Sequence, residues 1–298
     1  MSHFLAITDC SPDELIAILD RADELASRWA ARDMPRSLAG LRLGVWFYGQ
    51  GFRNRLAFEL GARAMGADVS FVPGELAVHE PIEDVGHYLA NWFDALVVRS
   101  RTHALLESLA RDFPLPVVNA RTDHNHPCEV VGDLQFVRRR RGGLDGLRVV
   151  FAGAVTNLCT SWFEAAVRLP IEVIQVAPPG HALDPVRVAA LNAGAAGRIS
   201  VCHDLHDAVD SATDLVYTDC WPDGDDEEAI RKAFLPHQIG PEILDRMNPR
   251  GIFLPCPPVT RGHEVSAEAM RSPRCLSYEA KNYLLHAQNA ILEFATRA

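Results

Sequence analysis

The chain has 298 residues, a length that suggests two domains of ordinary size. It is 48% hydrophobic and 23% charged, which excludes a disordered chain, a collagen-like chain and a simple solenoid. Asp and Glu outnumber Lys and Arg by 39 to 29, and the net charge of -10 argues against a nucleic-acid or anionic-membrane surface. A small anionic substrate is not excluded, because a buried cluster of arginines can lie inside an acidic protein.

The absence of recognisable targeting signals and the cysteine usage predict a cytoplasmic protein. No apolar run reaches the ~18–20 residues of a membrane helix, and the N-terminus lacks the basic and apolar regions of a signal peptide. The 7 cysteines are an odd number and form no C-x-x-C pair. This pattern favours reduced thiols over a disulfide framework or a zinc site.

Apolar runs and helical repeats alternate along the first half of the chain. Ser11, Pro12 and Glu14 have the pattern of a helix start, with a cap, a first-turn proline and a capping-box partner. The strands predicted after this helix are 43–48, 69–72, 95–99 and 116–119. The helices predicted between them are 53–65, 83–92 and 104–111. Such alternation predicts a parallel sheet flanked by helices.

A second alternating series follows a long predicted helix over 127–140. That helix ends in Arg138–Arg141, a basic run best interpreted as a solvated helix end beside favourable carbonyls. The strands predicted after it are 147–152, 171–176, 199–202, 215–219 and 252–255. The predicted helices are 157–169, 185–193 and 279–296. The chain is therefore expected to form two α/β halves.

The first candidate site is a glycine-containing turn between a predicted strand and a predicted helix. Gly49, Gln50 and Gly51 precede a helix whose first turn carries Arg53 and Arg55. A helix N-terminus offers free N–H groups, and the planar guanidinium groups suit phosphate oxygens. Glycine is also what a tight turn needs, and the arginines could instead form surface ion pairs. Function is favoured, because cations in a first helical turn oppose the dipole.

Other strand ends carry polar residues, and ligands of open α/β sheets bind at such ends. Arg99 ends an apolar strand and could face the same crevice or form a structural ion pair. His126 precedes Pro127, which keeps it extended, so its imidazole could donate to an oxyanion. A metal site around His126 is disfavoured, because the neighbouring ligand-type residues lie too close in sequence to converge. Gly153 also follows a strand, but the absence of G-x-G-x-x-G excludes dinucleotide binding.

Two further clusters lie late in the chain. Pro255, Pro257 and Pro258 surround Cys256 and predict a rigid, extended loop with unpaired carbonyls. A stiffened loop without a chemical role is an equal alternative. Asp219 ends another predicted strand, where a carboxylate could hold a cationic amine.

In this order, the clusters resemble those of the aspartate/ornithine carbamoyltransferase family. The stretch 51–59, Gly-Phe-Arg-Asn-Arg-Leu-Ala-Phe-Glu, resembles the family's Ser-Thr-Arg-Thr-Arg phosphate loop and following Phe-Glu helix. The stretch 126–129 resembles its His-Pro-x-Gln motif. Further resemblances are found at 80–84, Arg99, Asn157, Ser161, 218–221, 255–258 and 279–283. The motifs span nearly the whole chain.

The resemblance implies two doubly wound α/β domains with parallel sheets, joined by the long helix, with the C-terminal helix returning to the first domain. Residues 1–135 with 280–298 would bind carbamoyl phosphate, and 136–279 would bind the acceptor. A homotrimer is implied, because the segment 79–84 reaches a neighbouring subunit in relatives. The implied ligands are carbamoyl phosphate and an amine. No metal or organic cofactor is implied, since the phosphate can itself receive the amine proton.

The resemblance also assigns site residues. The implied donor contacts are Gly51, Phe52, Arg53, Asn54, Arg99, His126, Glu129, Cys256 and Pro257. The implied acceptor contacts are Asn157, Asp219 and Cys256. Arg53, Arg99 and His126 are the expected catalytic residues: the arginines suit the phosphate, and Arg53, Asn54 and His126 would steady the oxyanion.

Several departures from the family pattern bear on this chemistry. Gly51 and Phe52 replace two hydroxyl donors, Glu129 replaces a glutamine, and Tyr283 replaces an arginine. A hydrogen bond to a charged group contributes about 1.5–3 kcal/mol, so the loss of two is substantial. The candidates to supply the missing positive charge are Arg101, Arg121 and Arg261.

Three functions remain open, of which we expect the first: a divergent carbamoyltransferase, a family-derived enzyme with another donor or reaction, and a non-catalytic binding protein. Ornithine is not the expected acceptor. Trp221 is followed by 222–226, which is shorter in pattern and more acidic than the segment of the ornithine branch that contains its Ser-Met-Gly turn. The added carboxylates would oppose the ornithine α-carboxylate. Alternatively, the acids at 225–228 cap the next helix.

Overall fold

The computed structural model describes residues 3–49, 51–75, 78–224 and 226–297. The chain divides into two compact units, which are described separately. Unit 1 comprises Met1–Phe136 and Lys281–Ala298, and unit 2 comprises Val137–Ala280. None of the described helices is long and apolar enough to cross a membrane.

The sheet of unit 1 contains four parallel strands in the order β2-β1-β3-β4. The strands are β1 (Arg42–Phe47), β2 (Asp68–Val72), β3 (Ala95–Arg99) and β4 (Val117–Arg121). Most side chains of β1, β3 and β4 are buried, as expected for parallel strands covered on both faces. Arg99 and Arg121 end their strands and are register partners.

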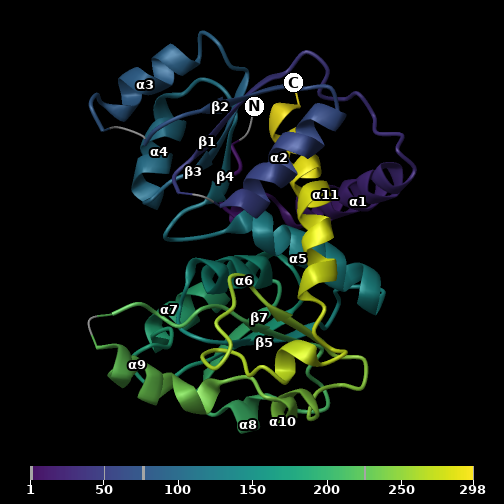
Figure 1. Cartoon of the computed structure of the whole chain (residues 1–298), viewed down its shortest axis with the longest axis vertical. Helices are drawn as coiled ribbons and strands as arrows, with labels where there is room; N and C mark the ends of the chain where they lie inside the picture. Colours follow the sequence, from purple (N-terminus) through teal and green to yellow (C-terminus); the bar gives the residue numbers. More distant parts are fainter. Residues whose placement is uncertain (1–2, 50, 76–77, 225, 298) are drawn as a thin grey trace. The chain divides into compact units, whose positions relative to one another are not determined.

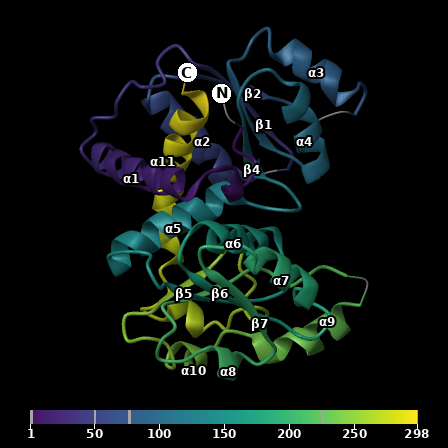
Figure 2. The same cartoon turned by 180° about the vertical axis from the view of Figure 1, so that it is seen from behind.

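Helices cover this sheet on both sides. The α-helices of unit 1 are α1 (Pro12–Ala30), α2 (Phe52–Ala64), α3 (Ile82–Leu89) and α4 (His103–Asp112). Two further helices, α5 (Pro127–Arg141) and α11 (Ser277–Thr296), run across the boundaries of the units. In Figures 1 and 2, α3 and α4 lie on one side of the sheet, and α1, α2 and α11 gather on the other. Ser11 and Glu14 form the predicted capping box of α1.

The sheet of unit 2 contains five parallel strands in the order β7-β6-β5-β8-β9. The strands are β5 (Arg148–Ala152), β6 (Glu172–Val176), β7 (Arg198–Cys202), β8 (Leu215–Thr218) and β9 (Ile252–Pro255). The helices are α6 (Asn157–Arg168), α7 (Pro185–Asn192), α8 (Leu205–Ala208), α9 (Glu227–Phe234) and α10 (Pro241–Leu244).

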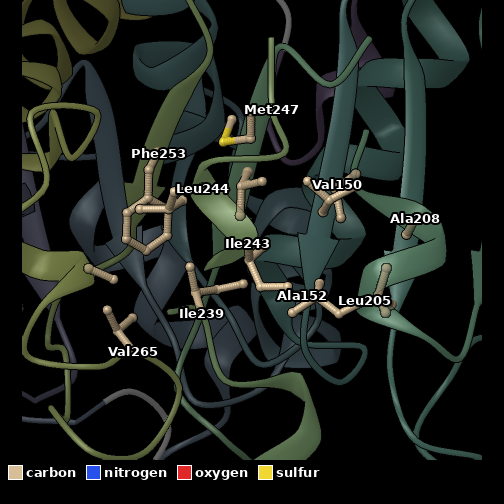
Figure 3. Packing of buried hydrophobic residues seen from close by; sticks show 14 of the residues in the cluster. Val150, Ala152, Leu205, Ala208, Ile239, Ile243, Leu244, Met247, Phe253 and Val265 are labelled. Carbon is tan, nitrogen blue, oxygen red and sulfur yellow. The ribbon is translucent and has the colours of Figure 1, made fainter. Parts of the chain in front are cut away.

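One face of the unit 2 sheet packs against short helices and loops. Val150 and Phe253 contribute strand side chains to a buried apolar cluster, which Leu205 of α8 and Ile243 of α10 complete (Figure 3). Trp162 of α6 lies with its ring 5.4 Å from that of Tyr217, centroid to centroid. Apolar side chains pack against both faces of the sheet. A ligand is therefore expected at the strand ends and not on a face.

The predicted fold class is confirmed, with parallel sheets in both units. The strands and long helices begin and end within three residues of their predicted positions. The short helices α8 and α10 were not predicted, and α9 was foreseen only in the alternative that the acids at 225–228 cap a helix. Arg139, Arg140 and Arg141 are exposed, as predicted for the basic run. Arg141 in addition donates to the Asp145 carbonyl and pairs with Asp214 at 3.2 Å.

Candidate active site

The start of α2 has the geometry of an anion-binding helix terminus. Gly51 is the N-cap residue with φ +32°, and it supplies no side-chain cap. The Arg53 side chain is exposed, and its guanidinium carbon lies 4.6 Å from the centre of the Phe52 ring. First-turn N–H groups and the Arg53 charge therefore lie together. Gln50 lies outside the described residues.

Arg99 lies directly against this helix start. A Cβ on Gly51 would lie 2.8 Å from Arg99 Nη1, so glycine is what allows the guanidinium to approach. Arg99 Nε is buried and has no hydrogen-bond partner among the described residues. Burial and the neighbouring Arg121 lower the pKa of Arg99 to about 10. Two guanidinium groups that repel each other at adjacent strand ends are a natural place for an anion.

A buried polar network lies beside these arginines. Asn54 of α2 donates to Glu129 Oε2 at 3.0 Å and accepts from Gln288 of α11 at 2.8 Å. Its amide nitrogen also lies 3.4 Å from His126 Nε2. The Asn54 side chain is thus committed within unit 1, and its first-turn N–H is what it can offer to a ligand.

At neutral pH, the histidine of this network is uncharged and the glutamate is ionised. Burial lowers the pKa of His126 to about 3, so the imidazole is neutral. Burial alone would raise the pKa of Glu129, but Lys281, His126 and Asn54 hold it below its usual range. Glu129 is therefore an ionised acceptor, and the neutral His126 can still donate one hydrogen bond.

Lys281 of α11 compensates the Glu129 charge. Its ammonium nitrogen lies 2.5 Å from Glu129 Oε1 and 3.2 Å from Asp133 Oδ1. The Glu129 and Asp133 side chains are 6% and 2% exposed, so both carboxylates need such a partner. Lys281 lies in the motif-like stretch 279–283, which gave it no role of its own, and no motif included Gln288.

The predicted residues of unit 2 gather at strand ends. Asp219 directly follows β8, and Cys256 directly follows β9 and donates its backbone N–H to the Thr218 carbonyl at 2.8 Å. Asn157 begins α6, the helix after β5. Because β5, β8 and β9 are neighbours, the three residues lie along one edge of the sheet. Pro257 follows Cys256 and forms a cis peptide bond with Pro258.

Unit 2 contains a pocket of about 310 Å³ whose lining begins at Cys220, the residue after Asp219. Its lining includes Trp221, whose ring stacks on His263 at 5.2 Å and 12°. The acidic residues that line it are Asp223, Glu227 and Glu264, and the basic one is Arg231. Burial raises the pKa of Glu264, which accepts the Thr260 N–H at 2.6 Å.

The acidic stretch after Trp221 has two roles. Asp226 accepts from the Ala229 N–H and caps α9, as the capping alternative predicts. Asp223 and Glu227 line the pocket instead. Asp225 lies outside the described residues.

Among the arginines considered for the missing charge, Arg121 alone lies at the donor residues of unit 1. Arg101 pairs with Glu75 at 2.8 Å and stacks on the Tyr48 ring at 3.6 Å. Arg261 lies in unit 2. Arg55 makes surface contacts: its Nε lies 4.0 Å from Glu59 Oε2, and its guanidinium carbon lies 3.6 Å from the centre of the Phe71 ring.

The structure shows two parallel-sheet α/β units, one of which carries paired arginines beside a helix start, and comparisons with known proteins identify the family. Residues 2–139 match the family model described as aspartate/ornithine carbamoyltransferase, carbamoyl-P binding domain. Residues 145–295 match that family's Asp/Orn binding domain. The chain belongs to the aspartate/ornithine carbamoyltransferase family, whose members are transferases.

Individual relatives cover nearly the full length. The ornithine carbamoyltransferase of Halorhodospira halophila is 34% identical over 99% of this chain and 98% of its own. That of Methanothermobacter thermautotrophicus is also 34% identical, with the same coverage. Among solved structures, the ornithine carbamoyltransferase from Burkholderia thailandensis matches with a TM-score of 0.90 and 28% identity, covering 99% of this chain and 98% of its own. The Pyrococcus furiosus ornithine carbamoyltransferase matches with a TM-score of 0.91 and 27% identity, covering 98% and 96%.

Proposed function

We propose that this protein transfers the carbamoyl group of carbamoyl phosphate to a primary amine. The observation that carries the proposal is the pair Arg99 and Arg121 at the ends of β3 and β4, beside the uncapped start of α2. This anion site lies within the part of the chain that matches a carbamoyl-phosphate-binding domain.

Carbamoyl phosphate would be held by positive charge and by hydrogen-bond donors in fixed positions. Arg53, Arg99 and Arg121, with the first-turn N–H groups of α2, would bind the phosphate. Neutral His126 would donate to the carbamoyl oxygen as negative charge develops on it. Glu129 Oε2 would accept a hydrogen bond from the carbamoyl NH₂ group.

The reaction would be a substitution at the carbamoyl carbon. The amine lone pair forms the new C–N bond, the bond between that carbon and the phosphate oxygen breaks, and the leaving phosphate takes the amine proton. Asp219 would hold an ammonium group of the acceptor, with Asn157, Cys256 and Pro257 completing the ligand contacts on unit 2.

Titration calorimetry with carbamoyl phosphate tests the donor assignment. Binding at micromolar to low millimolar concentration supports it, followed by detection of a ureido product by mass spectrometry with a panel of amines. No binding at millimolar carbamoyl phosphate would contradict it and would favour a family member with another donor or without catalysis. Enzyme-free samples correct for spontaneous donor decay.

For the acceptor, we propose an amine other than ornithine. The carboxylates of Asp223 and Glu227 at the pocket favour a ligand with more positive charge and oppose an α-carboxylate. The relatives named ornithine carbamoyltransferase point the other way, so ornithine is the reference substrate of the amine panel. Citrulline formation with kcat/KM above that of every other amine would refute this part of the proposal.

A homotrimer is the assembly that we propose. Phe52, Leu56 and Leu60 repeat every four residues on α2 and are 54%, 47% and 53% exposed. An apolar helix stripe of this kind suits burial against a second copy of the chain. Sedimentation equilibrium should give three times 32.8 kDa, and a stable monomer would overturn the assembly. We further propose a cytoplasmic location, which cell fractionation tests.

A further inference from the structure

The basic residues of this chain are almost all arginines. Of 29 Lys plus Arg residues, Lys232 and Lys281 are the only lysines. Lys232 is exposed on α9. The Lys281 side chain is only 16% exposed and contacts two buried carboxylates. Lys281 thus lies at a buried position where a compact ammonium fits better than a guanidinium.

Close packing of two helices explains the residue type. Gly132 of α5 would bring a Cβ within 3.1 Å of the Leu284 Cα of α11, so the backbones nearly touch there. Glu129 and Asp133 flank this contact on α5, and Lys281 comes one turn before Leu284. An ammonium is a compact charge with three donors and can serve both carboxylates. A planar guanidinium fork is wider and has a fixed geometry.

The two oxygens of Glu129 have different partners. Oε1 accepts from Lys281, and Oε2 accepts from Asn54 at 3.0 Å and lies 3.6 Å from His126 Nε2. Lys281 and Asn54 therefore fix the carboxylate from opposite ends. The oxygen that faces Asn54 and His126 is the one that the proposed function directs at the donor.

A second consequence is electrostatic. An ionised Glu129 without compensation would repel a phosphate bound at Arg99 and Arg121, which interact with the same His126. The Lys281 charge at 2.5 Å offsets this repulsion while leaving Oε2 able to accept a hydrogen bond. The acceptor function of a glutamine oxygen is kept, and the cost of the negative charge is reduced.

We propose that Lys281 is a positioning residue of the carbamoyl-donor site. It orients Glu129 and offsets the repulsion between the Glu129 carboxylate and the phosphate, so that an ionised Glu129 permits donor binding only when Lys281 is present. The proposal rests on the proposed function for the identity of the donor. It predicts an interaction between two specific side chains, which a purely structural ion pair would show only in stability and not in donor affinity.

A double-mutant cycle on the full-length protein tests this dependence. The four proteins are the wild type, Glu129→Gln, Lys281→Met and the double variant, with Lys232→Met as the matched lysine control. The donor KM and kcat, the Kd for carbamoyl phosphate and for inorganic phosphate, and the unfolding temperature are measured for each. Where Lys281→Met does not fold, Lys281→Gln replaces it in the cycle.

The expected result is a rescue. Loss of Lys281 alone should raise the donor KM and Kd by about 30-fold, since a buried charge is left unpaired. Glu129→Gln should raise them less than Lys281→Met does, because its amide keeps one acceptor oxygen but turns an NH₂ group toward the Lys281 ammonium. Adding Lys281→Met to Glu129→Gln should cost less than about fivefold in donor affinity. Asp133 then still loses its Lys281 contact, and that loss should appear in the unfolding temperature. Lys232→Met should match the wild type.

Two results would overturn the inference. One is a Lys281 variant with unchanged donor affinity, and the other is an equal loss with and without Glu129→Gln. If the wild type fails to bind carbamoyl phosphate, the proposed function fails, and the same cycle is then decided by the Kd for inorganic phosphate. Absence of phosphate binding as well would remove the positioning role of Lys281.

Discussion

Units 1 and 2 place their charged residues in contrasting ways. In unit 1, Asn54, Glu129 and Lys281 come from three helices and form one buried network. In unit 2, Asp223 and Glu227 lie close together in the sequence and are exposed at the mouth of a pocket. Compensated charges in the interior fix one geometry, whereas exposed carboxylates on a loop and at a helix start can change without disturbing the fold. Carbamoyl-donor binding should therefore be sensitive to helix packing, and acceptor choice to the exposed segment around Asp223.

The largest effect is expected from removing the central guanidinium of unit 1. Arg99→Met should weaken carbamoyl phosphate binding by about 100-fold or more, because a charge-assisted contact is lost from a partly buried site. Arg101→Met is the matched control, since Arg101 already pairs with Glu75. Calorimetry on both variants decides the point: equal affinities would show that Arg99 does not bind the donor.

The next largest effect is expected from packing variants, which should affect ligand binding in unit 1 but not in unit 2. Gly132→Ala pushes a methyl group against the α11 backbone, and Gly197→Ala would place one 2.1 Å from the Ile171 carbonyl oxygen in unit 2. Overpacking of this kind costs about 1–3 kcal/mol, so both variants should unfold at lower urea concentration. Only Gly132→Ala should also weaken donor binding, because it separates Lys281 from Glu129. Normal donor affinity in a destabilised Gly132→Ala protein would contradict the link between packing and site.

The fold could be predicted from sequence further than the site. Strands such as β3 are continuous apolar runs, and α1 carries its own capping box, so local patterns specified them. The helices α8 and α10 have four residues each, too few for any period to be visible.

Site residues divide in the same way. Arg99 and His126 could be proposed as site residues because one lies at a strand end and the other beside a proline. Lys281 lies in the motif-like stretch 279–283, but its partner could not be found, because it meets Glu129 across 152 positions of sequence. Its proposed role depends on the approach of α11 to α5, which only tertiary structure specifies.

Acid should loosen unit 1 through its buried histidine. The pKa of His126 is about 3 in the folded chain, against an ordinary value of 6.5, so the unfolded chain binds the extra proton in this interval. Stability from this group is complete above pH 6.5 and is lost as the pH falls toward 3. Urea unfolding at several pH values should show this slope, and His126→Gln should flatten it. An unchanged slope in His126→Gln would mean that His126 is protonated inside the fold.

Restoring a family-like hydroxyl at the loop should impair the site rather than repair it. Gly51→Ser places a Cβ 2.8 Å from Arg99 Nη1 at a backbone φ of +32°, so the guanidinium must move and the turn is strained. Donor affinity should fall about tenfold, equivalent to roughly 1–2 kcal/mol. Gly49→Ser is the control, because a Cβ there meets nothing within 4 Å, although its φ of +66° adds similar strain. Tighter donor binding by Gly51→Ser would show that a hydroxyl at this position contributes more than the present position of Arg99.

The smallest effect should come from the exposed carboxylates of unit 2. Asp223→Asn removes one negative charge from the pocket wall, where solvent screens it, so the acceptor KM should change by about two- to fivefold. The sign identifies the ligand: KM should rise for a cationic amine and fall for one whose carboxylate meets this wall. Asp226→Asn is the control, because Asp226 caps α9 and should alter stability slightly without moving KM. Steady-state kinetics with ornithine and with an amine that lacks a carboxylate compares the two signs directly. If Asp223→Asn left both KM values unchanged while Arg99→Met abolished donor binding, acceptor choice would have to depend on Asp219 and the loop at Cys256 instead.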